Sequence, residues 1–185
     1  MKTKLEGSQP RDHQSSNSPQ RSRTSAGLLM FRRKDNRLEV LLAHPGGPFF
    51  AKKDIGAWTI PKGEAALGED LLKRAQLEFE EELGIQPPGD SIELGWIKQK
   101  GGKIVHAWAV EGDLPDCFKL KSNNFEIEWP PRSGQRQKFS EVDRVAFFPE
   151  EVARQKINPA QVVFLDRLRE ILGSDNLGGH VLAGE

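Results

Sequence analysis

The sequence predicts a single α/β domain in which a mixed β-sheet lies between helices. Stretches rich in β-forming residues are interspersed with two stretches of helical periodicity, an order that is typical of such a sandwich. With 185 residues and a hydrophobic fraction of 36%, the chain can bury one good core but hardly two. We therefore expect one domain over residues 25–173, between a polar tail at residues 1–24 and a flexible tail at residues 174–185.

The N-terminal tail and the composition limit the function classes. The first 24 residues are rich in Ser, Gln, Arg and Pro and carry five basic against two acidic side chains, so we expect disorder. They lack the apolar core of a secretory signal, and no later stretch approaches the roughly 20 apolar residues of a membrane span. Cys117 is the single cysteine, which rules out an internal disulfide framework. We expect a cytoplasmic monomer or homodimer without a membrane partner.

The charge balance bears on the kind of ligand. The formal net charge is zero, which argues against broad attraction to nucleic acid and favours small phosphorylated substrates. RNA stays a weaker candidate partner, because the basic tail could contact it.

Two hairpins are expected to form most of the sheet. Residues 26–33 and 38–44 are rich in β-formers and flank a polar turn. Residues 92–98 and 103–111 form a second pair across Gly101 and Gly102. Between the hairpins, a loop rich in Gly, Pro and aromatic residues leads to a short strand at residues 58–60, and we expect this loop to face substrate.

The C-terminal part predicts one more strand and one more helix. Residues 112–144 form a polar connection that is longer than a compact domain needs as a plain linker, and such loops are often functional. Residues 145–148 predict the last strand. A helix should begin at its cap Asn158, with Pro159 in the first position, and end at Gly173.

Residues 63–85, GEAALGEDLLKRAQLEFEEELGI, predict a helix that carries an active site. Glu78, Glu81 and Glu82 stand at i, i+3 and i+4, so their carboxylates project from one helical face. Like charges at this spacing cost roughly a few tenths of a kcal/mol, whereas clustered oxygen ligands suit Mg²⁺ or Mn²⁺. An apolar set would anchor the other side of the helix: Leu72, Ala75, Phe79 and Leu83. A solvated acidic face is the alternative for the glutamates alone.

The spacing resembles the Nudix box, Gly-x5-Glu-x7-Arg-Glu-U-x-Glu-Glu-x-Gly-U, in which U is a bulky apolar residue. The matching positions are Gly63, Glu69, Glu78, Phe79, Glu81, Glu82, Gly84 and Ile85. A pattern with this many fixed positions is far more specific than a lone glycine motif. The resemblance covers about residues 25–172 and implies a Nudix-type α/β/α sandwich that acts as a pyrophosphohydrolase.

The resemblance also implies roles for single residues. Glu78, Glu81 and Glu82 would be metal ligands for Mg²⁺ or Mn²⁺ and would act in catalysis. The Gly63 carbonyl is a plausible further ligand, because glycine permits close backbone approach, and Glu69 is expected as an outer metal group.

The general base is open between two positions. Nudix enzymes use either a box glutamate or one from a later loop. Glu141, six residues before Phe147, resembles the later glutamate of diadenosine polyphosphate hydrolases. A solvated loop acid is the alternative for Glu141.

One box position departs from the pattern, because this chain has Leu77 where the family has arginine. That arginine is understood to orient a box glutamate. Arg74 could substitute, since it lies four residues before Glu78 on the same helical face.

The substrate is also suggested by resemblance. The segments WTIPKG (58–63) and KIVHAW (103–108) are similar to the diadenosine tetraphosphate hydrolase branch, which implies a nucleoside or dinucleoside polyphosphate. Lys53, Lys62 and Lys103 are candidate phosphate contacts. Such enzymes often clamp adenine with tyrosine, but this chain has none, so one of four aromatic side chains would stack on the base instead or belong to the core: Phe49, Phe50, Trp58 or Trp129.

Three functions follow. The first is a metal-dependent hydrolase of nucleoside or dinucleoside polyphosphates. The second is an RNA 5′-pyrophosphohydrolase, which would use the basic tail and the basic side chains near residue 136 to follow the backbone. The third is a catalytically weak Nudix nucleotide sensor, suggested by Leu77.

Overall fold

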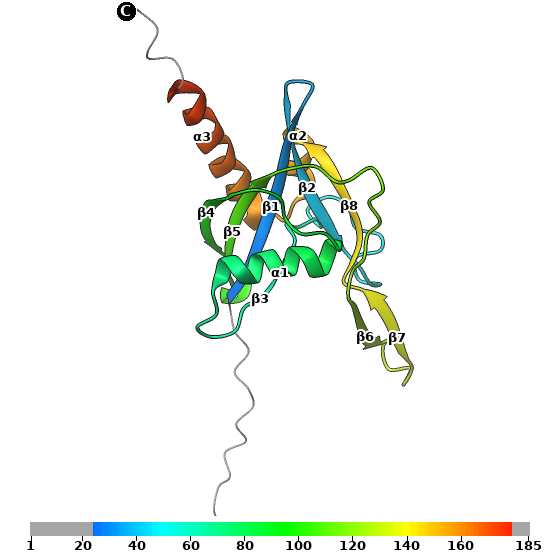
Figure 1. Cartoon of the computed structure of the whole chain (residues 1–185). Coiled ribbons are helices and arrows are strands. Elements are labelled where there is room, and N and C mark those ends of the chain that lie inside the picture. The colour runs from blue at the N-terminus through cyan, green and yellow to red at the C-terminus, as the bar shows by residue number, and fades with distance from the viewer. Residues whose placement is uncertain (1–23, 179–185) are drawn as a thin grey trace, which may run out of the picture.

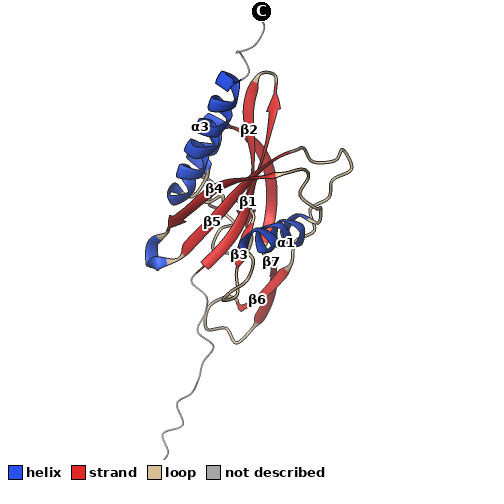
Figure 2. Ribbon diagram, turned by 60° about the vertical axis from the view of Figure 1, so that its left-hand side comes forward, coloured by secondary structure: helices blue, strands red, loops and turns tan. Residues whose placement is uncertain are grey.

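The computed structural model describes residues 24–178, which form a mixed six-stranded sheet with helices on both faces (Figures 1 and 2). The strands of this sheet are β1 (Thr24–Lys34), β2 (Arg37–Pro45), β3 (Lys62–Glu64), β4 (Ser91–Lys98), β5 (Ile104–Glu111) and β8 (Val142–Pro149). Their order is β4-β5-β1-β2-β8, and β3 pairs with β1. Strands β1 and β5 are parallel, whereas the other pairs are antiparallel. The predicted mixed-sheet α/β fold is confirmed.

Both predicted hairpins are present. The turn between β1 and β2 places Asp35 and Asn36 at φ 49° and 60°, the left-handed region that a two-residue hairpin turn requires and that Asp and Asn tolerate. Strands β4 and β5 are joined through a short 3-10 turn, Lys100–Gly102, in which Gly101 has φ 83°. Each turn therefore has the residue types that its backbone needs.

The helices cover opposite faces of the sheet, as Figure 2 shows. Helix α1 (Leu71–Leu83) packs Ala75, Phe79 and Leu83 against the side of β1 that carries Leu28 and Met30. On the other face lie α2 (Glu150–Lys156), the 3-10 turn Pro159–Gln161 and α3 (Val162–Gly178). Because both faces are covered, β1 is buried without interruption from Ser25 to Phe31 rather than at alternate positions.

Several boundaries differ from the prediction. Residues 58–60 form isolated bridges instead of a strand, with Trp58 opposite Ile157 and Thr59 opposite Ala43. Asn158 caps the 3-10 turn through its side chain, so α3 begins only at Val162. Helix α3 continues past Gly173 to Gly178, because a single glycine weakens a helix by only about 1 kcal/mol and does not stop it. Helix α2 was not predicted.

The long connection is not a plain loop. It contains a second, two-stranded sheet of β6 (Asn124–Glu128) and β7 (Arg136–Ser140), which projects from the end of β8 in Figure 1. Phe125 faces Phe139 across the pair. No strand was predicted within the polar connection over residues 112–144, and the last strand begins at Val142 rather than at Val145.

The remaining expectations concern the ends of the chain. Apart from Thr24, the tail predicted at residues 1–24 lies outside the described residues, as do residues 179–185. Within residues 24–178, no helix is both long enough and apolar enough to cross a membrane.

Candidate active site

Helix α1 fixes the three box glutamates. The Asp70 carboxylate caps the helix by accepting from the backbone N–H groups of Leu72 and Lys73 at 3.1 and 3.2 Å. Gly84 ends it at φ 78°, and its N–H donates to the Glu80 carbonyl. The helix is therefore bounded by its own sequence, and Glu78 and Glu82 are buried on its sheet-facing side.

The glutamates border a cavity of about 340 Å³ between α1, β3 and the start of β8. The residues that line it are Ser25, Lys62, Gly63, Glu64, Arg74, Glu78, Glu81, Glu82, Lys103, Asn123 and Glu141. Wider hollows lie elsewhere, including one of about 530 Å³ beside Arg33 and Arg37. The smaller cavity gathers most of the candidate residues, so we take it as the site.

Glu78 is held from two sides. Its carboxylate forms an ion pair with Arg74, four residues earlier on the helix, and Arg74 also lies 3.6 Å from Glu81. On the other side the carboxylate lies against the backbone of Gly63, where any Cβ would overlap with it. The glycine of the box is thus required for space, and Arg74 occupies the position foreseen for it.

Glu82 is electrostatically strained. Its side chain is 9% exposed, and Oε2 is buried without a hydrogen-bond partner. Burial raises the pKa of Glu82 to about 7, against the opposing effects of the Lys62 charge and the Lys62 backbone N–H. Glu141 and Glu81 raise it further, because their negative charges lie nearby. The positive charge of Lys62 therefore does not offset the cost of burying an ionised Glu82.

Two lysines contribute positive charge to the cavity. Burial lowers the pKa of Lys62, and the positive charge of Lys103 lowers it as well, while Glu82 and Glu64 act in the opposite direction. Lys103 pairs with Glu64 at 3.2 Å. Both ammonium groups border the same hollow as the carboxylates, which suits a site that receives a phosphate chain.

The structure does not bring every predicted residue to this cavity. The Glu69 carboxylate accepts from the Ala66 N–H at 2.7 Å and braces the loop before α1. The Trp58 indole is 4% exposed and donates to Asp54 at 2.8 Å. The Lys53 ammonium lies 5.1 Å from the centre of the Phe50 ring. These three residues are absent from the lining, so their roles stay predictions.

Sequence reasoning also missed lining residues. Ser25 reaches the cavity through the pairing of β1 with β3, and Asn123 reaches it from the position directly before β6. Neither belongs to a local motif, so no spacing signal could have identified them. Glu64 follows Gly63 directly, at a position where the box allows any residue, so the pattern did not identify it.

The site suits a divalent cation chemically. Across residues 24–178, no three His, Cys, Asp or Glu side chains stand in ready metal-binding geometry. The cavity nevertheless gathers several carboxylates beside the Ser25 hydroxyl and the Asn123 amide, and Oε2 of Glu82 is buried without a hydrogen-bond partner. Hard cations such as Mg²⁺ prefer this donor set, so the residues present fit such an ion.

Comparison with known proteins agrees with this geometry. The family model described as the NUDIX domain matches residues 21–168. The asymmetrical bis(5′-nucleosyl)-tetraphosphatase of Rattus norvegicus is 31% identical over 118 residues, which are 57% of this chain and 76% of that protein. This relative belongs to the branch that the sequence resembles.

Solved structures share the fold. An Ap4A hydrolase of C. elegans, in a binary complex, has a TM-score of 0.59 at 22% identity and covers 81% of this chain and 98% of its own. The Nudix domain of Shewanella oneidensis NrtR, complexed with ADP ribose, has a TM-score of 0.56 at 16% identity, with coverages of 85% and 94%. The family match over most of the chain, with the relative that is 31% identical, shows that the protein belongs to the Nudix domain family and is a Nudix hydrolase.

Proposed function

We propose that the protein is a Mg²⁺- or Mn²⁺-dependent pyrophosphohydrolase of nucleoside or dinucleoside polyphosphates. The observation that carries the proposal is that the candidate glutamates and two lysines line one cavity: Glu78, Glu81, Glu82, Glu141, Lys62 and Lys103. The tetraphosphatase relative supports this substrate class, because its name states that class and it is similar over most of its length.

The chain's own residues have separable tasks in this reaction. Lys62 and Lys103 attract the oxygens of the phosphate chain as point charges. Glu141 is the candidate base that accepts a proton from the attacking water, while the electron pair of the broken P–O bond leaves with the departing phosphate. A bound divalent cation would neutralise the developing charge, and Glu78, Glu81 and Glu82 would hold it.

Two alternatives remain as outcomes of the test. An RNA 5′-pyrophosphohydrolase would draw on basic side chains of the β6–β7 hairpin, where Arg136 is already paired with Glu126 at 3.5 Å. A sensor without turnover was suggested by Leu77. That side chain is 47% exposed and borders a different hollow, beside Lys73 and Glu80.

The test is product analysis by chromatography after incubation with diadenosine polyphosphates, nucleoside triphosphates, nucleotide sugars and 5′-triphosphorylated RNA. Each reaction is run with Mg²⁺, with Mn²⁺ and with EDTA. We expect a mononucleotide product from a polyphosphate, its loss in EDTA and its return when Mg²⁺ is restored. Glu82→Gln should lower kcat by about 100-fold or more, since it removes a group that the site needs charged.

Glu80→Gln is the matched control, because it makes the same chemical change on the same helix at an exposed position outside the cavity. Its turnover should stay within about twofold of the wild type. Preferential hydrolysis of RNA with a steep salt dependence would favour the RNA reading. Nucleotide binding with no product from any substrate would favour the sensor.

A further inference from the structure

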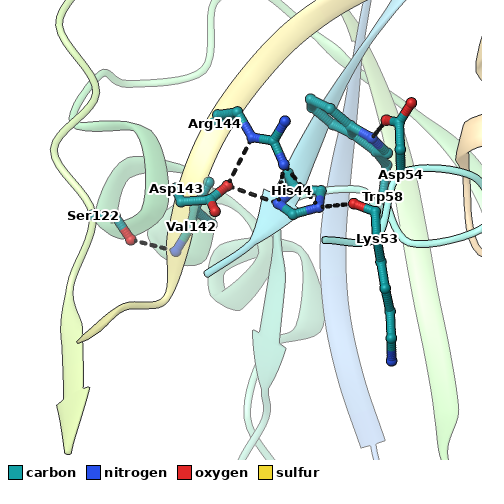
Figure 3. Close-up of polar contacts among 8 residues, drawn as sticks. All are labelled: His44, Lys53, Asp54, Trp58, Ser122, Val142, Asp143 and Arg144. Carbon is teal, nitrogen blue, oxygen red and sulfur yellow. Dashed lines mark hydrogen bonds and ion pairs between the residues drawn. The ribbon is translucent and has the colours of Figure 1, made fainter. Parts of the chain in front are cut away.

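His44 is a buried polar residue close to the active site but outside its cavity. Its side chain has no exposed surface and lies at the end of β2. Nε2 donates to the Lys53 carbonyl at 2.8 Å, and Nδ1 lies 2.7 Å from Oδ1 of Asp143. Figure 3 shows the imidazole between these two partners, one on the loop after β2 and the other on β8. His44 therefore links two segments that are far apart in sequence.

The ring itself has little freedom. Trp58 packs edge-on against it with the ring centres 5.1 Å apart. Nη2 of Arg144 lies 3.0 and 3.1 Å from the two ring nitrogens, and Nε of Arg144 lies 3.3 Å from Asp143 Oδ1. Asp143 is thus fixed by His44 and by its neighbour Arg144 together. Burying an imidazole costs free energy unless it is hydrogen-bonded, so a need for packing alone does not explain a histidine here.

The link is made where the sheet is irregular. The pairing of β2 with β8 shifts register between His44 and Pro45, because His44 pairs with Arg144 and Pro45 with Val142. Asp143 is the extra residue of this bulge, without a paired residue on β2. Bulges redirect side chains and frequently lie beside active sites. Glu141, the candidate base, stands two residues before Asp143.

The backbone around Glu141 is held by further contacts. Its carbonyl accepts from the Gly46 N–H at 2.9 Å, and its N–H donates to the Asn123 carbonyl at 2.8 Å. The next residue, Val142, donates its N–H to the Ser122 hydroxyl at 2.9 Å (Figure 3). Gly46 also lies so close to the Ser140 carbonyl that a Cβ would collide with it. Every contact acts on the same short segment, residues 140–143.

We propose that His44 is a positioning residue for hydrolysis, which acts through Asp143 to fix the carboxylate of Glu141 over the cavity. This inference rests on the proposed function of Glu141. Its physical basis is that Glu141 stands beside the irregular start of β8, and a displacement of about 1 Å at a reacting group can cost about 100-fold in rate. The His44–Asp143 contact adds a buried side-chain constraint to the backbone hydrogen bonds that hold this segment.

The experiment is a double-mutant cycle in kcat and KM on the polyphosphate that the wild type hydrolyses best. The variants are His44→Phe, Asp143→Ala, Glu141→Gln and the His44→Phe/Glu141→Gln pair. We expect His44→Phe to lower kcat by about 10-fold to 100-fold. The same loss should be nearly absent when Glu141 is already glutamine, because residues that act as a unit are not additive. Asp143→Ala should reproduce the loss with KM changed less than about threefold, since it leaves the bond from His44 to Lys53 intact.

Asp54→Ala is the control. It removes an exposed side chain from the same loop, together with its bonds to Trp58 and Lys156, but it touches nothing in residues 140–143. Its kcat should stay within about twofold of the wild type. Losses that multiply in the His44→Phe/Glu141→Gln pair, or an unchanged kcat in Asp143→Ala, would overturn the proposal.

Amide hydrogen exchange separates this inference from the proposed function, because it needs no turnover. His44→Phe should speed exchange at residues 140–143 by about 10-fold or more, while exchange in α1 stays unchanged. Unchanged exchange at this segment would reject the positioning role even in a protein that hydrolyses none of the substrates.

Discussion

At the scale of single residues, the contact of Arg74 with Glu78 bears on the box position where the family has arginine and this chain has Leu77. Arg74 pairs with Glu78, whereas Leu77 is exposed on another side of α1. Arg74→Met should therefore lower kcat by about 10-fold to 100-fold, because Glu78 loses its counter-charge and moves away from the other carboxylates. Steady-state kinetics measures this. Lys73→Met, which alters an exposed cation one residue earlier, should leave kcat within about twofold.

Leu77→Arg is expected to give no gain, since residue 77 borders a different hollow from the active-site cavity. If Arg74→Met retains full turnover, or if Leu77→Arg raises it markedly, Arg74 does not compensate for the missing arginine. The kcat of Arg74→Lys should fall between those of the wild type and Arg74→Met, because a lysine keeps the charge but not the geometry of the guanidinium.

The residues that could be predicted for the site are those whose neighbours are local. Helical spacing alone placed Glu78 and Glu82 together and put Arg74 beside Glu78. Trp58 illustrates the opposite case: it is adjacent to the box in sequence, but its bridge to Ile157 turns it into the core. Which face of a sheet a side chain lies on depends on strand pairing between distant segments, and the local sequence does not reveal that pairing.

At the scale of elements, the cap of α1 makes a measurable contribution to the free energy of unfolding. Asp70 accepts from two of the backbone N–H groups that begin the helix, and Asp70→Ala leaves them without this partner. We expect a loss of about 1 kcal/mol in the free energy of unfolding, measured by urea denaturation. Asp90→Ala, at an exposed position before β4, should change it by less than about 0.5 kcal/mol. Equal effects of the two substitutions would mean that the cap contributes nothing.

The elements missed from the sequence have weak local signals. Helix α2 has seven residues and only one fully buried apolar side chain, Ala153, so no helical stripe is visible. Strands β6 and β7 have only five residues each. The turn between them contains Pro130 and Pro131, which are unfavourable for strand formation. The two strands are held partly by contacts outside the pair, such as that of Phe49 with Trp129, with ring centres 5.4 Å apart. A sheet of two strands is only marginally stable on its own, so tertiary contacts decide whether it forms.

At the scale of the whole molecule, the strand order builds the site and is the part that sequence reasoning could not supply. Local turns predicted the hairpins β1–β2 and β4–β5, but the parallel pairing of β1 with β5 and the pairing of β2 with β8 join distant segments. These two pairings bring Glu141 across from the far end of the chain to the box helix. The box helix therefore predicts three of the five glutamates that line the cavity, Glu64 follows the box glycine directly, and the fold supplies Glu141.

This assembly concentrates negative charge, and the concentration should reduce the stability of the metal-free protein. The pKa of Glu82 is raised from 4.5 to about 7, mainly by burial, so the folded state binds this proton more tightly than the unfolded state does. Stability is then lost as the pH rises between these two values, by about 3 kcal/mol in total. Glu82→Gln cannot ionise. In EDTA it should be about as stable as the wild type near pH 4.5 and more stable by about 1–3 kcal/mol at pH 8.

Urea denaturation across this pH range, with Glu80→Gln as the exposed control, measures the difference. The control should follow the wild type at every pH, because its carboxylate is exposed on the helix and outside the cavity. Adding Mg²⁺ should reverse the order: a cation at about 100 times its Kd stabilises the wild type by about 2.7 kcal/mol, and Glu82→Gln gains less. A stability difference that does not vary with pH would show that Glu82 is not strained in the folded protein. An equal response of both proteins to Mg²⁺ would show that the cation binds somewhere other than this cluster.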